Sequence, residues 1–192
     1  GRIATLRMRP MTMPEREDLP VTVSLARILA GDTEVGGQTG LRLDAYADAI
    51  VQSGLPGLLG QPARVVRSQL DSYVDRLIEH ELEEAGLSVR RPLAVRGWLR
   101  AYAAATSSTA AWEKIRDAAS AGSAAPLSRP ATQPYIELLA QLRVLDDLEA
   151  WVPSSNRLSR LTGAPKHHLA DPGLAAALLG VRVEQLLRGA GA

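Results

Sequence analysis

Two glycine-containing segments of this sequence have residue types that could contact a phosphate or a nucleotide base. A P-loop needs backbone N–H groups from a glycine-rich loop and a lysine that reaches the phosphates. Residues 31–40, with the sequence GDTEVGGQTG, supply the glycines but no lysine. Neither Lys114 nor Lys166 lies in a G-x-x-x-x-G-K-S/T motif. We therefore expect no catalytic residue and no ATP hydrolysis by this chain alone.

The second segment, Gly54-Leu55-Pro56, could lie against a nucleotide base. A glycine permits close approach of the backbone, and a proline ring offers a rigid apolar face. The alternative is a plain turn that ends a helix, and the residues alone favour that alternative.

The three histidines are poorly placed to bind a metal ion. His167 and His168 fall on a predicted strand, where adjacent side chains point to opposite faces. His80 lies among glutamates, as is usual on a solvated helix face. We expect no metal site and no cofactor bound by this chain itself.

An acidic cluster, Asp146, Asp147 and Glu149, could do acid–base work or hold Mg²⁺. It lies on a predicted strand with no convergent histidine or lysine. We therefore expect an exposed strand whose carboxylates keep it soluble.

Composition narrows the class of protein. The net charge is +1, so no global field calls for nucleic acid or an anionic membrane. The chain contains 0 cysteines, which excludes disulfides and thiolate zinc sites. No apolar run approaches the ~20 residues that a membrane span needs, and no signal-peptide layout is present. We expect a soluble cytoplasmic protein without a membrane partner.

The first half of the chain has a partly alternating segment and several helical patterns. Residues 1–9 predict a short strand, which needs a sheet to join because its backbone groups must find partners. Helices are predicted over 21–30, 42–53 and 62–85, the last with Pro62 in its first turn and Gly86 as its stop.

The second half predicts three helices followed by two strands. The helices cover 93–105, 109–120 and about 132–143, with Thr132 as the cap of the third and Pro134 in its first turn. The strands cover 144–152 and 166–170. A last helix follows, with Asp171 as N-cap, Pro172 at the first helical position and Gly180 as stop.

Three helices and a two-stranded hairpin follow the order of a winged helix-turn-helix. We predict a mainly α fold: a helical lid-like subdomain (1–91), then a winged-helix domain with a small β-wing (92–192). The connector Arg90-Arg91-Pro92 is the expected boundary.

Three stretches resemble bacterial and archaeal AAA-type ATPases whose C-terminal half is a domain of unknown function. The segment from Gly1 to Glu15 is similar to the family's "GR…L…L-x-PL…E" exit from the ATPase core. Ser53 to Gly57 is similar to its "GG-x-P" turn, which Tyr73-Val74-Asp75-Arg76 follows. Residues 135–151 are similar to its winged-helix segment, and Ala164 to Leu174 to its "PK-x-Y-x-x-D-x-G-L" ending.

The resemblance implies that this chain is the non-catalytic C-terminal part of such an ATPase. ATP and Mg²⁺, with the Walker motifs, would belong to a region before residue 1, and a nuclease-like domain would follow residue 192. The ATPase core would be a partner, and the Gly-x-Pro turn would contact adenine through Gly54, Leu55 and Pro56. The sequence departs from the family at Ser53, where the first glycine is missing, and in an inserted loop at 121–127.

The winged helix would engage double-stranded DNA or a protein partner. Its third helix would enter the major groove and its wing would contact the backbone. Glu137 and the lack of lysine or arginine between Arg129 and Arg143 oppose strong DNA binding. The alternative is a protein-interaction or regulatory domain without nucleic-acid binding, which predicts an exposed apolar patch. The candidate DNA contacts are Arg129, Thr132, Gln133, Arg157, Arg160 and Lys166.

Overall fold

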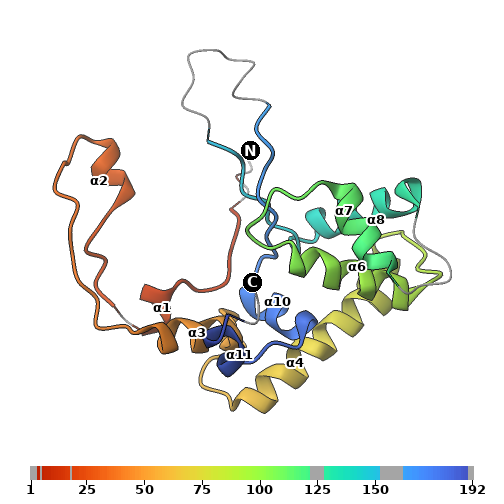
Figure 1. Ribbon diagram of the computed structural model, residues 1–192, viewed down its shortest axis with the longest axis horizontal. Coiled ribbons are helices and arrows are strands. Elements are labelled where there is room, and N and C mark those ends of the chain that lie inside the picture. Colours follow the sequence, from red (N-terminus) through yellow and green to blue (C-terminus); the bar gives the residue numbers. More distant parts are fainter. Residues whose placement is uncertain (1–3, 5, 18, 122–127, 152–161, 190–192) are drawn as a thin grey trace.

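The computed structural model describes residues 4, 6–17, 19–121, 128–151 and 162–189 and is mainly helical, as predicted (Figure 1). Two short helices, α1 (Met13–Glu17) and α2 (Leu25–Leu29), precede a helical body. The body contains α3 (Leu43–Gln52), η1 (Pro56–Leu58), α4 (Ala63–Arg76), η2 (Leu77–Glu81), α5 (Leu82–Glu84), α6 (Pro92–Ala104), α7 (Trp112–Ser120), α8 (Arg129–Gln141), α10 (Pro172–Leu179) and α11 (Val183–Leu187).

The helix predicted over 62–85 is confirmed as the continuous run of α4, η2 and α5. Its apolar stripe is buried at Val66, Leu70, Val74 and Leu77 because these positions recur at helical spacing. Gly86 follows the run at a φ of 95°, a left-handed conformation that favours glycine.

A single hydrophobic core joins the two halves of the body. It includes Leu70 and Val74 from α4, Trp98 and Tyr102 from α6, and Leu174 from α10. The predicted boundary at Arg90-Arg91-Pro92 stays a prediction, and the core contains residues from both sides of it.

The start of α8 differs from the prediction. The helix begins at Arg129, and Ser128 occupies the N-cap position without a side-chain cap bond. Thr132 therefore lies inside the helix, where its hydroxyl donates to the Ser128 and Arg129 carbonyls. Pro130 accounts for the earlier start because its fixed φ suits a first turn, which leaves Pro134 as a proline within the helix.

The last predicted helix is confirmed in α10. Asp171 is the N-cap, and its carboxylate accepts a hydrogen bond from the Gly173 N–H. Pro172 is the first helical residue. Gly180 ends the helix at a φ of 74°.

The two strands predicted after α8 are not formed within the described residues, which contain isolated bridges only. Leu145 pairs antiparallel with Leu169, and Leu148 with Lys166. The ladder is interrupted because His167 turns its backbone to the other side. Its N–H donates to the Ser108 carbonyl at 3.0 Å, and its carbonyl accepts from the Ser107 N–H at 2.8 Å. The outer part of the predicted wing, residues 152–161, lies outside the described residues.

The strand predicted for residues 1–9 is also absent from its described part, residues 4 and 6–9. No backbone hydrogen bond pairs this part with the other described segments. The helix predicted over 21–30 is shortened to α2, and Ser24 caps it through its side chain. Val21 and Val23 stay outside it and are exposed.

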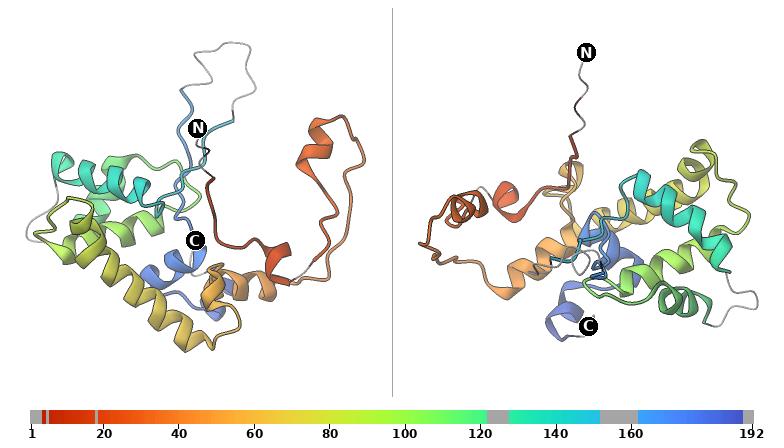
Figure 2. Two further views of the ribbon diagram at one scale, coloured as in Figure 1. Left: turned by 180° about the vertical axis from the view of Figure 1, so that it is seen from behind. Right: turned by 90° about the horizontal axis from the view of Figure 1, so that it is seen from above.

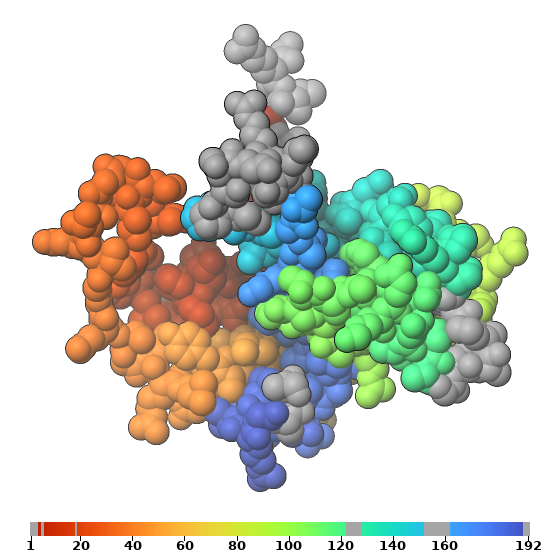
Figure 3. All heavy atoms as spheres, turned by 45° about the horizontal axis from the view of Figure 1, so that its top comes forward, coloured from red at the N-terminus to blue at the C-terminus, as the bar shows by residue number. Residues whose placement is uncertain are grey.

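Residues 19–41, which we call the arm, extend away from the body and return to it (Figure 2). α2 lies near the far end of the arm, where the space-filling view shows it standing apart from the helical body (Figure 3). In the described part of the chain, no second layer of structure covers the side chains of the arm.

Candidate interaction surface and its junction with the body

Three distant segments meet where the N-terminal region joins the body. The Gly54 N–H donates to Asp171 Oδ2 at 2.7 Å, and Asp171 Oδ1 accepts from the Gly173 N–H at 2.7 Å. Asp171 is only 1% exposed. Its carboxylate thus satisfies two buried N–H groups and ties the turn after α3 to the start of α10.

The same turn also holds the segment before the arm. The Gly54 carbonyl accepts from the Met11 N–H at 2.7 Å. Arg16 then bridges the two sides, because its Nε donates to the Met11 carbonyl at 2.9 Å and its Nη1 to the Ala49 carbonyl at 2.6 Å. A Cβ on Gly54 would collide with the Arg16 guanidinium and lie 2.7 Å from the Met11 oxygen, so glycine is required here.

Ser53 carries backbone strain at this junction. Its φ of 66° and ψ of 159° belong to a region that is essentially restricted to glycine. The side chain is fully buried, and Oγ accepts a hydrogen bond from the Leu55 N–H at 3.1 Å. This conformation explains in physical terms why a glycine would suit the position at which the sequence departs from "GG-x-P".

The three predicted nucleotide contacts therefore differ in which of their groups remain available to contact a base. Both backbone polar groups of Gly54 are already bonded within the chain. Leu55 is half-buried and Pro56 is exposed. A base could contact the turn only through the Leu55 and Pro56 side chains, and this role stays a prediction.

The arm carries a concentration of exposed apolar side chains. Leu25 is 70% exposed and Leu29 is 80% exposed on α2. A surface of this kind usually marks an interaction site rather than a stable free surface. The exposed large apolar residues of the arm are Val21, Val23, Leu25, Ile28, Leu29 and Val35.

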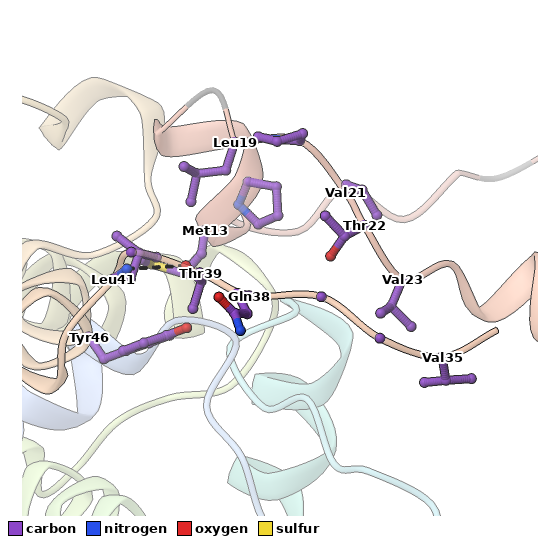
Figure 4. Close-up of a pocket in the computed structure, with 15 residues that line it drawn as sticks. Met13, Leu19, Val21, Thr22, Val23, Val35, Gln38, Thr39, Leu41 and Tyr46 are labelled. Carbon is purple, nitrogen blue, oxygen red and sulfur yellow. Dashed lines mark hydrogen bonds between the residues drawn. The ribbon is translucent and has the colours of Figure 1, made fainter.

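A groove runs between the two legs of the arm and the start of the body, and we call it the arm groove (Figure 4). Its volume is about 690 Å³, which is within the range of ligand-sized pockets. Tyr46 of α3 and Met13 of α1 line its inner end. The outer walls are Leu19 to Val23 on the first leg and Val35 to Leu41 on the second.

The candidate DNA contacts form no continuous basic surface among the described residues. Arg129 faces Glu113 at 3.6 Å, and the Gln133 amide donates to Glu137. Thr132 is buried, with its hydroxyl bonded to the backbone of its own helix. Lys166 is exposed. Arg157 and Arg160 lie outside the described residues.

A buried polar network that the sequence did not reveal holds the 144–148 and 166–170 segments against α6 and α7. The Tyr102 hydroxyl donates to the Asp147 carboxylate, and burial followed by this hydrogen bond raises the pKa of Tyr102. Nε2 of His167 lies 2.8 Å from the Ala110 carbonyl, and Nδ1 lies 3.6 Å from Asp147 Oδ1. Trp112 packs edge-on against His167 and stacks on Tyr102.

The acidic cluster is therefore not the exposed strand that the sequence predicts. Asp146, which is 12% exposed, binds Arg7 and Arg9 of the N-terminal segment, each at 2.7 Å. The Arg9 hydrogen bond, with the charges of Arg7 and Arg9, lowers the pKa of Asp146 despite its partial desolvation. Asp147 turns to Tyr102, and Glu149 is exposed. Two of the three carboxylates thus have structural partners.

Two kinds of feature, a metal-binding cluster and a membrane-spanning helix, are absent from the described residues. No group of three or more histidine, aspartate or glutamate side chains is placed there to hold a metal ion. None of the helices in the described part of the chain has the length and apolar character that crossing a membrane requires.

One protein family matches this sequence. Its description is "Domain of unknown function", DUF8612, and the match covers residues 43–185. The matched region begins at the first residue of α3 and ends within α11, so it coincides with the helical body and leaves out the arm. Neither the curated proteins nor the solved structures contain a match to this chain.

Proposed function

This chain belongs to the family defined by the domain of unknown function DUF8612, and from that premise we propose that it is a non-catalytic protein-interaction module. In this proposal, the helical body is a stable platform and the arm docks on a protein partner. The partner is an AAA-type ATPase core, in the same polypeptide or another, as the resemblance of the turn and ending motifs suggests.

The observation that carries the proposal is the exposed apolar surface of the arm. Six large aliphatic side chains are exposed within residues 21–35 and none of this segment is buried, whereas the body has a buried core of the same residue types. Covering such a surface stabilises a complex by roughly 25 cal/mol for each Å² of apolar area removed from water. The arm is thus suited to contact another folded surface.

The junction supports a coupling role within this proposal. Arg16, Gly54 and Asp171 connect the segment that leads into the arm with the starts of the turn and of α10. A base held against Leu55 and Pro56 would contact the same turn. Nucleotide bound by the ATPase core would then be sensed at the point where the arm meets the body.

Site-specific photo-crosslinking in cells tests the proposal. A photoreactive amino acid at Leu29, on α2, is compared with one at Leu93, an equally exposed apolar residue of α6 in the body. We expect position 29 to crosslink efficiently to a region that carries Walker A and B motifs, and position 93 not to do so. Equal crosslinking at the two positions, or capture of a region without those motifs, would count against it.

DNA binding is a second candidate function, which one arrangement favours. The α6, α7 and α8 helices are followed by an antiparallel pair of segments, and the α6–α7 connection joins that pair through Ser107, Ser108 and His167. A winged helix-turn-helix combines helices and paired segments in this order. The finer fold, with a β-wing, belongs to this proposal.

Fluorescence anisotropy of a labelled duplex at low salt tests this second function. Phosphate contacts predict affinity that falls steeply as salt rises, and Lys166→Ala should weaken binding and reduce the salt slope by about one. Leu93→Ala serves as the control because it removes no charge. If the chain with Arg129, Arg157 and Arg160 intact shows no salt-dependent binding, the result would contradict the DNA-binding function.

A further inference from the structure

We propose that the arm groove binds an uncharged, extended peptide segment of the partner, added as a β-strand along residues 35–40. This inference rests on the proposed function and names the chemistry of the partner at the same site. Three features of the arm support it: the uncharged lining of the groove, the free backbone N–H groups of the second leg and the open face of its glycines.

Among the described residues, the lining of the arm groove contains no aspartate, glutamate, lysine or arginine. Its polar side chains are those of Thr22, Gln38, Thr39 and Tyr46, which offer hydroxyl and amide groups only. A charged side chain buried there would lose hydration without gaining an opposite charge. The groove therefore selects an uncharged segment with apolar or hydroxyl side chains.

The second leg of the arm offers backbone groups that could pair with a strand. Within the described chain, the N–H groups of residues 36–40 have no hydrogen-bond partner, whereas Val35 and Leu41 at the two ends are bonded locally. Unpaired backbone in an extended segment is a template for an added strand. Six residues of strand span roughly 20 Å, and this sets the length of the segment.

The glycines of this leg leave its face open. A Cβ on Gly36 or on Gly40 would meet nothing within 4 Å. On Gly37 it would lie 2.6 Å from Thr22 Oγ1, so the two legs of the arm approach each other closely at this point. The absence of side chains at 36 and 40 lets another backbone approach closely.

The probe for this inference is a fluorescein-labelled heptapeptide of alternating valine and threonine with blocked ends. Fluorescence anisotropy measures its binding to the full chain. Two matched peptides are the controls: one with methylated amides at alternate residues, which cannot complete the strand pairing, and one with glutamate in place of valine. We expect both controls to bind at least about tenfold more weakly than the parent peptide.

Variants of the chain locate the site. Val21→Asp places a charge on the wall of the groove and should weaken the parent peptide at least about tenfold, since an exposed arm residue adds little to folding. Leu93→Asp, on the surface of the body, should leave binding unchanged. Circular dichroism of both variants verifies that the helical body is intact.

Several results would overturn the inference. One is failure of the parent peptide to bind, and another is binding of the methylated peptide as tight as that of the parent. The others are binding of the parent peptide to the Val21→Asp variant as tight as to the unchanged chain, and displacement of the peptide by neutral phosphatidylcholine vesicles. Self-association of the chain that excludes the peptide would also overturn it, because a second copy would then be the occupant. If the peptide fails while position 29 still crosslinks to a Walker-motif region, this inference falls and the proposed function stands.

Discussion

The arm and the helical body contain the same aliphatic residue types but bury them to opposite extents. In the body, Leu70 is 2% exposed, because it lies in the core where α4 packs against α10 and α3. In the arm, Leu29 is 80% exposed, because no other described element of the chain covers it. Apolar composition therefore does not decide burial, because a facing element is also needed. In the proposed function, a partner supplies the element that would cover the arm.

The family match sharpens this contrast. It covers the body from residue 43 to 185 and stops short of the arm. The body is thus the unit that the chain shares with its family. The arm lies outside that unit, and its exposed apolar surface is what the proposed partner would cover.

Replacing a leucine with alanine in the body and in the arm should give the largest difference in the free energy of unfolding. Leu70→Ala should lower the free energy of unfolding by about 2–5 kcal/mol, because it leaves a cavity in a packed core. Leu29→Ala should change it by less than about 0.5 kcal/mol. Urea denaturation followed by circular dichroism measures both. Comparable losses would contradict the distinction between arm and body.

The junction should be the next most sensitive place. Asp171→Ala leaves the buried N–H groups of Gly54 and Gly173 without an acceptor, and should cost about 2–3 kcal/mol of unfolding free energy. Asp44→Ala, in the exposed first turn of α3, is the matched control and should cost well under half as much.

Urea titrations of the two variants decide between these values. A loss at Asp171 no greater than that at Asp44 would mean that the junction does not hold the turn. In that event the arm would have no fixed connection with the body.

A smaller, pH-dependent effect is expected where the N-terminal segment meets the body. The Arg9 hydrogen bond lowers the pKa of Asp146 below its unfolded value of about 3.9. A lowered carboxyl pKa stabilises the fold above that value, and the contribution is lost as pH falls through the folded pKa. Asp146→Asn should therefore cost about 1 kcal/mol at pH 7 and progressively less as the pH falls through the folded pKa.

Unfolding free energies at pH 7 and pH 2 test this. Glu149→Gln, an exposed neighbour, is the control and should change stability little at either pH. An Asp146→Asn cost that is the same at pH 7 and pH 2 would contradict the ion-pair explanation.

Helix ends were predictable where the signals are local. Asp171, Pro172 and Gly180 act within one turn of the helix they bound, and α10 begins and ends where they predict. The start of α8 was missed because two prolines, at 130 and 134, offered alternative first turns. The sequence could not indicate which of them the surrounding structure would use.

The contacts of the candidate site depend on distance in space rather than along the chain. Gly54 and Asp171 are 117 residues apart, and Tyr102 and Asp147 are 45 apart. No periodicity or motif joins such pairs, although the "GG-x-P" likeness drew attention to the turn. The sequence of residues 31–40 excludes a P-loop because it has no lysine, but it contains no signal for the open backbone that lines the groove.

Hydrogen–deuterium exchange of the arm, alone and in complex, tests the central claim most directly. In the isolated chain, the amides of residues 36–40 should exchange within seconds while those of α4 stay protected. Binding of the ATPase region captured through position 29 should slow the arm amides at least about tenfold and leave α4 unchanged. Arm amides that are already protected in the isolated chain, or that exchange equally fast in the complex, would contradict the account.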